Sequence, residues 1–218
     1  MFFRQLFNPG STSALVDAAF SDVSQMLHQS AEMLDHALAF LLENTTLSVD
    51  LEDMDDLIDE AERRVRRTIL QHLAVNPKQD LVASLVLVSM VQDAERIGDF
   101  ARGLVELVKL ARSPRQGPFA DGLRGIANRL RPLFAICERA FRLADVGEAR
   151  RVIVAHRELR RAFKDYRNRV AVSDLTADMA VVYSGSAQIL RRVGAHLGNI
   201  ASTVVQPYDR IRHHDEDV

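Results

Sequence analysis

Residues 92–99 read Gln-Asp-Ala-Glu-Arg-Ile-Gly-Asp, a stretch that sets Glu95 and Asp99 four residues apart with Asp93 close by. On an α-helix, residues four apart share a face, and like charges at that spacing oppose helix formation by about 0.2–0.5 kcal/mol. A hard metal ion bound between the carboxylates would offset this cost. The alternative is a solvent-exposed acidic face that Arg96 and Arg102 neutralise. The spacing by itself leaves both interpretations open.

The rest of the chain predicts an all-α fold. Apolar residues recur at helical spacing almost throughout, and no alternating run exceeds a few residues. Residues that cap or break helices divide this pattern into six long segments. In the first half the segments run from Ser11 or Ser13 to Asn44, from Ser48 to Asn76-Pro77, and from Asp80 to about Arg112. In the second half they run from about Phe119 to Ala144, from about Gly147 to Ala171, and from the capping pair Ser173-Asp174 to Gln206-Pro207.

A boundary between two halves is expected at residues 113–118, where two prolines and a glycine occur within six residues. Three helices are predicted on each side, in residues 1–112 and 119–218. An offset of 96 residues aligns Arg96-Ile97-Gly98 with Arg192-Val193-Gly194. Similarity at such a period indicates that one three-helix unit was duplicated.

The charge of the chain is divided between these halves. The formal net charge is −2, but residues 1–118 carry −7 and residues 119–218 carry +5. This asymmetry predicts that the halves meet different partners, or each other. With Cys137 as its single cysteine, the chain can form neither an internal disulfide nor a thiolate metal cluster, which fits a reducing compartment.

No segment is expected to cross a membrane. The longest uncharged apolar run, Leu81 to Val91, is too short for a span, and residues 1–10 lack the features of a signal peptide. Four apolar residues of that opening could touch a membrane surface, but packing on the body or disorder is the simpler expectation. They are Phe2, Phe3, Leu6 and Phe7.

The sequence resembles the PhoU family, whose members accompany inorganic phosphate transporters. Residues 94–99 resemble its Leu-Glu-Arg-Ile-Gly-Asp signature, residues 55–62 its acidic second helix, and residues 76–81 its proline-containing turn. Residues 1–4 resemble the transporter-accessory branch. The resemblance covers the whole chain and is strongest over residues 48–107. It implies two three-helix bundles side by side, carboxylates that hold metal clusters, and a regulatory role in phosphate uptake.

In the first repeat, the resemblance assigns six carboxylates on two facing helices to one metal site. They are Asp55, Asp59, Glu62, Asp93, Glu95 and Asp99. Because all six would bind through oxygen, the expected ion is iron, manganese, magnesium or calcium rather than structural zinc.

The second repeat departs from the family pattern, because Arg191 and Ala195 stand where Glu95 and Asp99 would recur. A second metal cluster is therefore not expected. The preceding segment offers His156 and Glu158 among arginines, a composition that suits an anion better than a cation. The candidate anion-binding residues are Arg160, Arg161, Arg191 and Arg192. The alternative is a solvated face or contact with the acidic half.

Catalysis is not predicted. The chain lacks Gly-x-Ser-x-Gly, Gly-x-x-x-x-Gly-Lys-Ser/Thr and His-Glu-x-x-His. A carboxylate-bridged metal enzyme or metal-binding protein on a helical bundle is the alternative, but the Glu-x-x-His typical of di-iron proteins is also absent. His213 to Asp217 could bind a metal, although terminal polar runs are commonly disordered.

The function predicted from the sequence is therefore that of a PhoU-like adaptor. The expected partner is a phosphate transporter or its signalling partner at the cytoplasmic face of the membrane, with the chain cytoplasmic or peripheral to that face. A homodimer is compatible with this prediction. Nucleic acid is not an expected partner, because the basic half lacks interleaved aromatics and helix-turn-helix spacing.

Overall fold

The structure is a computed structural model that describes residues 14–47 and 49–211. Over these ranges the chain forms helices and no strand, which confirms the predicted all-α fold. The first half contains α2 (Ala14–Glu43), α3 (Leu51–Val75) and α4 (Leu81–Val108). The second half contains α5 (Pro118–Leu130), α6 (Pro132–Leu143), α7 (Val146–Ala171), α8 (Ala177–Val205) and the short 3-10 helix η1 (Tyr208–Arg210).

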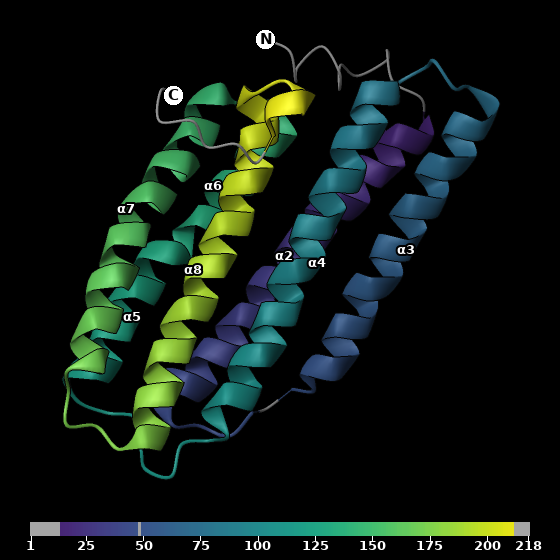
Figure 1. The fold of residues 1–218 in the computed structure, drawn as a ribbon. Coiled ribbons are helices and arrows are strands. Elements are labelled where there is room, and N and C mark those ends of the chain that lie inside the picture. The colour runs from purple at the N-terminus through teal and green to yellow at the C-terminus, as the bar shows by residue number, and fades with distance from the viewer. Residues whose placement is uncertain (1–13, 48, 212–218) are drawn as a thin grey trace.

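The two halves form neighbouring bundles, as the resemblance implied. Figure 1 shows α2, α3 and α4 beside α5 to α8, with the long helices inclined in the same direction. The bundles meet where α4 packs on α8 and where α2 contacts α6. As a result, α3 and α7 lie on opposite sides of the molecule.

The predicted fourth helix is kinked. The chain leaves regular α-helix at Arg131 and resumes it at Pro132, because proline lacks an N–H group and its ring clashes with the carbonyl four residues earlier. Arg131 nevertheless keeps helical angles, and its N–H donates to the Ala127 carbonyl at 2.9 Å. Helices α5 and α6 together therefore occupy the place of one long helix, and the plan of six segments holds.

Two predicted helix ends need correction. Helix α4 ends at Val108 rather than near Arg112. The assignment of Ser173-Asp174 as the cap of the last helix is wrong, since the N-cap is Thr176. The Ser173 hydroxyl instead donates to the Val170 carbonyl at 2.7 Å, so it terminates α7. Several sequence predictions concern positions outside the described ranges: Ser11, Ser13, Ser48, the apolar residues of the opening arm, and His213 to Asp217.

The segment that joins the bundles is attached to the end of α2. The guanidinium of Arg115 donates to the carbonyls of Phe40 at 2.6 Å and Leu41 at 3.2 Å. The Asn44 side chain exchanges two hydrogen bonds with the Arg115 backbone, at 2.8 and 3.1 Å. These bonds satisfy carbonyls that the helix end leaves without intrahelical partners. They also position the start of α5 relative to α2.

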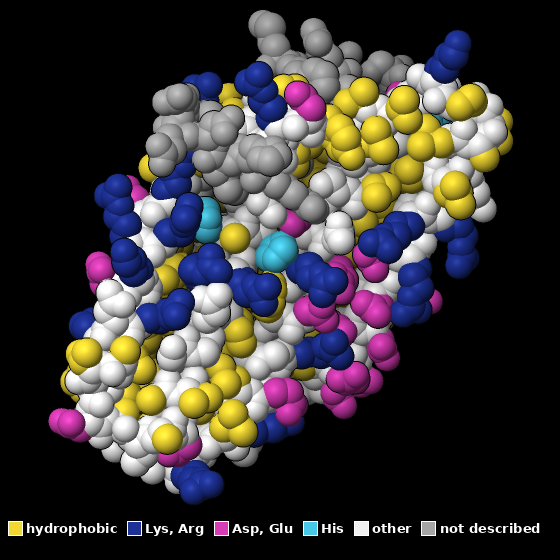
Figure 2. Space-filling model, viewed as in Figure 1, with side chains coloured by type: hydrophobic (Ala, Val, Ile, Leu, Met, Phe, Trp, Pro, Cys, Tyr) yellow, Lys and Arg dark blue, Asp and Glu magenta, His cyan; other side chains and the backbone are white. Residues whose placement is uncertain are grey.

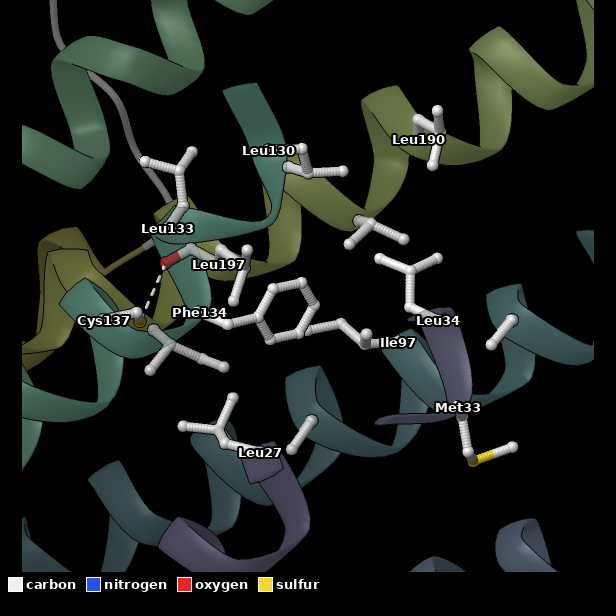
Figure 3. Close-up of a cluster of buried hydrophobic side chains, with 14 of the residues drawn as sticks. Leu27, Met33, Leu34, Ile97, Leu130, Leu133, Phe134, Cys137, Leu190 and Leu197 are labelled. Carbon is white, nitrogen blue, oxygen red and sulfur yellow. Dashed lines mark hydrogen bonds between the residues drawn. The ribbon is translucent and has the colours of Figure 1, made fainter. Parts of the chain in front are cut away.

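One hydrophobic core runs through both bundles. Figure 3 shows Phe134 of α6 among side chains from other helices, including Leu27 of α2, Ile97 of α4 and Leu197 of α8. Cys137 lies in the same region, and its thiol donates to the Leu197 carbonyl at 3.5 Å. Burial raises the pKa of this thiol to about 12, so Cys137 serves packing rather than reactivity. Within the described ranges, no helix has the length and apolar character needed to cross a membrane.

Candidate functional site

Five of the six predicted carboxylates lie along the contact between α3 and α4. We call them the acidic set: Asp55, Asp59 and Glu62 on α3 with Glu95 and Asp99 on α4. Their charges act on one another across the two helices. The charges of Asp59 and Asp99 raise the pKa of Asp55. The charges of Asp99 and Glu62 raise the pKa of Glu95. In Figure 2, acidic side chains gather over this part of the first bundle.

Gly98 allows the two helices to approach beside the acidic set. A Cβ atom at this position would lie 3.1 Å from Ile58 Cδ1 and 3.2 Å from Asp55 Oδ1. Both distances are shorter than ordinary van der Waals contact. The glycine of the signature therefore has a packing reason: it leaves room for Asp55 against α4.

Arginines on both helices neutralise part of the acidic set in this arrangement. On α3, Arg63 contacts Asp59 at 3.1 Å and Arg66 contacts Glu62 at 2.6 Å, and on α4 Arg96 and Arg102 pair with the other three. Arg102 contacts Asp55 through Nε at 3.1 Å and Asp99 through Nη2 at 3.0 Å. Arg96 contacts Asp99 at 3.0 Å and Glu95 at 3.6 Å. The side chains as placed thus correspond to the alternative in which Arg96 and Arg102 balance the carboxylates.

The neutralisation is incomplete. Burial, together with the neighbouring charge of Asp99, raises the pKa of Glu95 to about 7 against the opposing effect of Arg96. Burial likewise raises the pKa of Asp55 to about 6, although Arg102 opposes the rise. Carboxyl groups with raised pKa values are held where negative charge is unfavourable. A bound cation would relieve that cost.

The chemistry of the acidic set suits a hard cation, because all its ligands are carboxylate oxygens. As the side chains stand in the described ranges, no three His, Cys, Asp or Glu residues lie close enough to enclose one. Binding by all five carboxylates would require Arg63, Arg66, Arg96 and Arg102 to release them. All four arginines are partly exposed, and even Arg102, the least exposed, has a side-chain exposure of 34%, so solvent is available to receive them.

Asp93 does not join the acidic set. Two helical positions separate it from Glu95, a rotation of about 200° that turns it to the opposite face of α4. There it is 2% exposed and faces α8, with one carboxylate oxygen 2.7 Å from His196 Nδ1 and 3.0 Å from Asn199 Nδ2. Its role is to join the two bundles. The grouping of Asp93 with the other carboxylates is therefore corrected by the structure.

Three of the four candidate anion-binding arginines lie together on the second bundle. The positive charges of Arg160 on α7 and of Arg192 lower the pKa of Arg191 on α8. A fourth arginine, Arg167 of α7, also lowers it. Arg161 is not among these neighbours. Figure 2 shows basic side chains over α7 and α8 on the face that carries the acidic patch. Arg167 was missed from the sequence, although its separation of seven residues from Arg160 places both on one helical face.

Comparisons with known proteins agree with this architecture. Residues 23–108, which cover most of α2 and all of α3 and α4, match the family model described as PhoU domain. The chain is 28% identical over 196 residues to "Phosphate-specific transport system accessory protein PhoU homolog 1" of Thermotoga maritima, an alignment that covers 85% of this chain and 83% of that protein.

Two solved structures share the fold. The regulatory protein PhoU of the Streptococcus pneumoniae phosphate transport system superposes with a TM-score of 0.78 at 16% identity, covering 87% of this chain and 93% of that one. PhoU from Pseudomonas aeruginosa superposes with a TM-score of 0.77 at 24% identity, covering 88% of this chain and 96% of that one.

The fold and the acidic set define an all-helical protein of two bundles with a PhoU domain in the first. Residues 23–108 match the PhoU domain, which confirms the resemblance seen in the sequence over the first bundle.

Proposed function

We propose that this chain regulates inorganic phosphate uptake by contact with a phosphate transporter or its signalling partner at the cytoplasmic face of the membrane. The observation that carries the proposal is the relative from Thermotoga maritima, which is named as an accessory protein of a phosphate transport system and aligns with 85% of the chain. The PhoU domain over residues 23–108 supports it, since that region contains the whole acidic set.

In this proposal the acidic set acts as a clamp between α3 and α4. When a divalent or trivalent ion binds, carboxylates from both helices would hold it, and the ion would supply the positive charge that Arg96 and Arg102 provide without it. Residues Asp55 and Asp59 would contribute from α3, and Glu95 and Asp99 from α4. The two charge-balancing arrangements leave different side chains on the outer surface, so metal status would alter what a partner meets.

The regulatory role is tested in cells of the source organism that lack this chain. We expect altered phosphate uptake, restored by the wild-type gene and not by the double variant Glu95→Gln/Asp99→Asn. Crosslinking of the tagged protein in intact cells should recover components of the phosphate transporter and not of an unrelated transporter. Unchanged uptake together with no transporter crosslink would refute the proposal.

The metal site is tested separately on purified protein. Wild-type protein should bind manganese, and Glu95→Gln/Asp99→Asn should bind it much more weakly, because two anionic ligands are lost. The matched control is Asp53→Asn/Asp56→Asn, which removes two exposed carboxylates from α3 outside the acidic set. Equal manganese binding by the wild type and both variants, measured by calorimetry, would exclude the acidic set as the metal site.

A further inference from the structure

The second bundle contains a counterpart of the acidic set with inverted charge. Gly194 on α8 occupies the place of Gly98, because a Cβ at Gly194 would lie 3.3 Å from His156 Nδ1 just as one at Gly98 would lie 3.2 Å from Asp55 Oδ1. His156 on α7 is thus the spatial counterpart of Asp55 on α3.

The flanking positions follow from this equivalence. One turn after Asp55 comes Asp59, whereas one turn after His156 comes Arg160. Three residues before Gly98 comes Glu95, whereas three residues before Gly194 comes Arg191. The same packing arrangement therefore presents two guanidinium groups where the first bundle presents two carboxylates.

These arginines form a cluster with a shared polar contact. Gln188 Oε1 accepts from Arg191 Nε at 3.2 Å and from Arg167 Nη1 at 3.3 Å, so one side-chain oxygen links α7 and α8. Burial lowers the pKa of Arg191, and the neighbouring charges of Arg160, Arg192 and Arg167 lower it further. The cluster is consequently a place where positive charges repel one another.

No carboxylate of the described chain relieves this repulsion by an ion pair with Arg160, Arg167 or Arg191. The arginines of the first bundle differ, since Arg96 contacts two carboxylates and Arg102 contacts three. Arg192 is also engaged differently, because its guanidinium lies 5.0 Å from the centre of the Phe100 ring on α4. Three arginines thus remain to receive an external anion.

We propose that Arg160, Arg167 and Arg191 form a binding site for a phosphoryl group that carries at least two negative charges. Guanidinium groups bind phosphoryl oxygens through paired charge-assisted hydrogen bonds, and several around one anion convert mutual repulsion into attraction. Arg160 and Arg167 are exposed to solvent. Beside Arg167, a surface cavity of about 570 Å³ opens between α7 and α8, lined by Arg167 and Ser184.

The site accommodates more than one phosphoryl group. Arg160 and Arg167 are seven residues apart on α7, a separation of about 10.5 Å along the helix axis. Two linked phosphoryl groups carry more charge and more oxygens than one, so they can make more of the charge-assisted hydrogen bonds that the three arginines offer. Pyrophosphate is accordingly expected to bind more tightly than orthophosphate. The proposal is independent of phosphate-uptake regulation, because it concerns binding by the isolated protein.

The test is titration calorimetry of the full chain with pyrophosphate and orthophosphate at about 0.15 M salt, where long-range charge effects are screened. We expect wild-type protein to bind pyrophosphate and Arg160→Gln/Arg191→Gln to bind it at least roughly tenfold more weakly. The matched control is Arg139→Gln/Arg142→Gln, which removes two charges from α6 where the arginines lie near Glu148 and Glu138. Far-UV circular dichroism verifies that all variants remain folded.

A second arm distinguishes a soluble phosphoryl compound from a lipid headgroup. Sedimentation with phosphatidic acid vesicles should give weaker binding for Arg160→Gln/Arg191→Gln if the headgroup is the source. Loss specific to that variant in either arm supports the site, and the arm identifies the source. Absence of binding in both arms, or equal losses in the control variant, would overturn the proposal.

Discussion

At the scale of single residues, Gly98 couples packing to charge. Because Gly98 has no side chain, Asp55 fits beside α4. There Asp55 lies 3.1 Å from Arg102, which lowers its pKa, and near Asp99, which raises it. The burial that follows is also the main cause of the raised pKa of Asp55. One glycine thereby determines both how closely the helices approach and how unfavourable the carboxylate charge becomes.

Replacing Gly98 by leucine should destabilise the protein by about 1–3 kcal/mol, because the added atoms would overpack the contact with Ile58 and Asp55. Gly125 of α5 is the matched control, since a Cβ there meets nothing within 4 Å. Gly125→Leu should be neutral or stabilise by up to about 0.8 kcal/mol through helix propensity. Urea unfolding of both variants measures the difference, and equal effects would contradict the packing role of Gly98.

The raised pKa values of Glu95 and Asp55 predict a dependence of stability on pH in metal-free protein. Their folded-state values of about 7 and about 6 exceed the ordinary values of 4.5 and 3.8, so the folded state binds more protons than the unfolded state between these limits. Their contribution to stability is therefore complete below the ordinary values and is lost as pH rises through the folded-state values.

The free energy of unfolding, measured by urea titration with chelator present, should include a component that falls between about pH 5 and about pH 7.5. Glu95→Gln should reduce that fall, because the amide does not ionise. Asp53→Asn removes an exposed carboxylate of α3 outside the acidic set and should leave the fall unchanged. If Glu95→Gln and wild type showed the same pH profile, Glu95 would not be its source.

At the scale of elements, α3 buries fewer apolar side chains than α2 or α4, the other long helices of the first bundle. It packs on α2 and α4, and its buried positions include the polar residues Asp55 and His72. Helix α4, in contrast, is buried against both bundles and carries a longer set of buried apolar residues. Local opening should therefore begin at α3.

Hydrogen exchange should report this difference and its response to metal. Amides of α3 are expected to exchange faster than those of α4 in metal-free protein, and added manganese should slow α3 selectively by joining it to α4. The variant Glu95→Gln/Asp99→Asn should lose the manganese effect while keeping the faster exchange of α3. Uniform slowing of all helices by manganese would argue against a local clamp.

At the scale of the whole molecule, the two bundles share one core rather than two. Phe134 is 7% exposed and lies among apolar side chains of both bundles (Figure 3). Asp93 adds a polar connection from α4 to His196 of α8. Contacts of this kind couple the folding of one bundle to that of the other.

Phe134→Ala should therefore destabilise both bundles together, by about 3–5 kcal/mol for loss of a buried aromatic side chain. Scanning calorimetry of the wild type should give one transition, and the variant should give one transition at lower temperature. Leu143→Ala serves as control, because Leu143 is 62% exposed and its loss should change stability by less than about 0.5 kcal/mol. Two separate wild-type transitions would show that the bundles unfold independently.

The sequence by itself determined the features that depend on neighbouring residues. Helical periodicity predicted the long helices, and the spacing of Glu95 and Asp99 predicted an acidic face on α4. The sequence also identified Arg96 and Arg102 as the alternative source of neutralising charge. The kink at Pro132 was accessible to the same local reasoning, since proline disrupts the hydrogen bond to the preceding turn.

Only the tertiary structure decided which faces meet. Asp93 and His196 are 103 residues apart in the chain, and nothing local distinguishes a carboxylate that joins two bundles from one that faces α3. The cluster of Arg160, Arg167 and Arg191 likewise depends on how α7 lies against α8. Helical spacing fixes the angle of each side chain about its own helix axis, whereas the packing of both bundles on a common core fixes what lies opposite it.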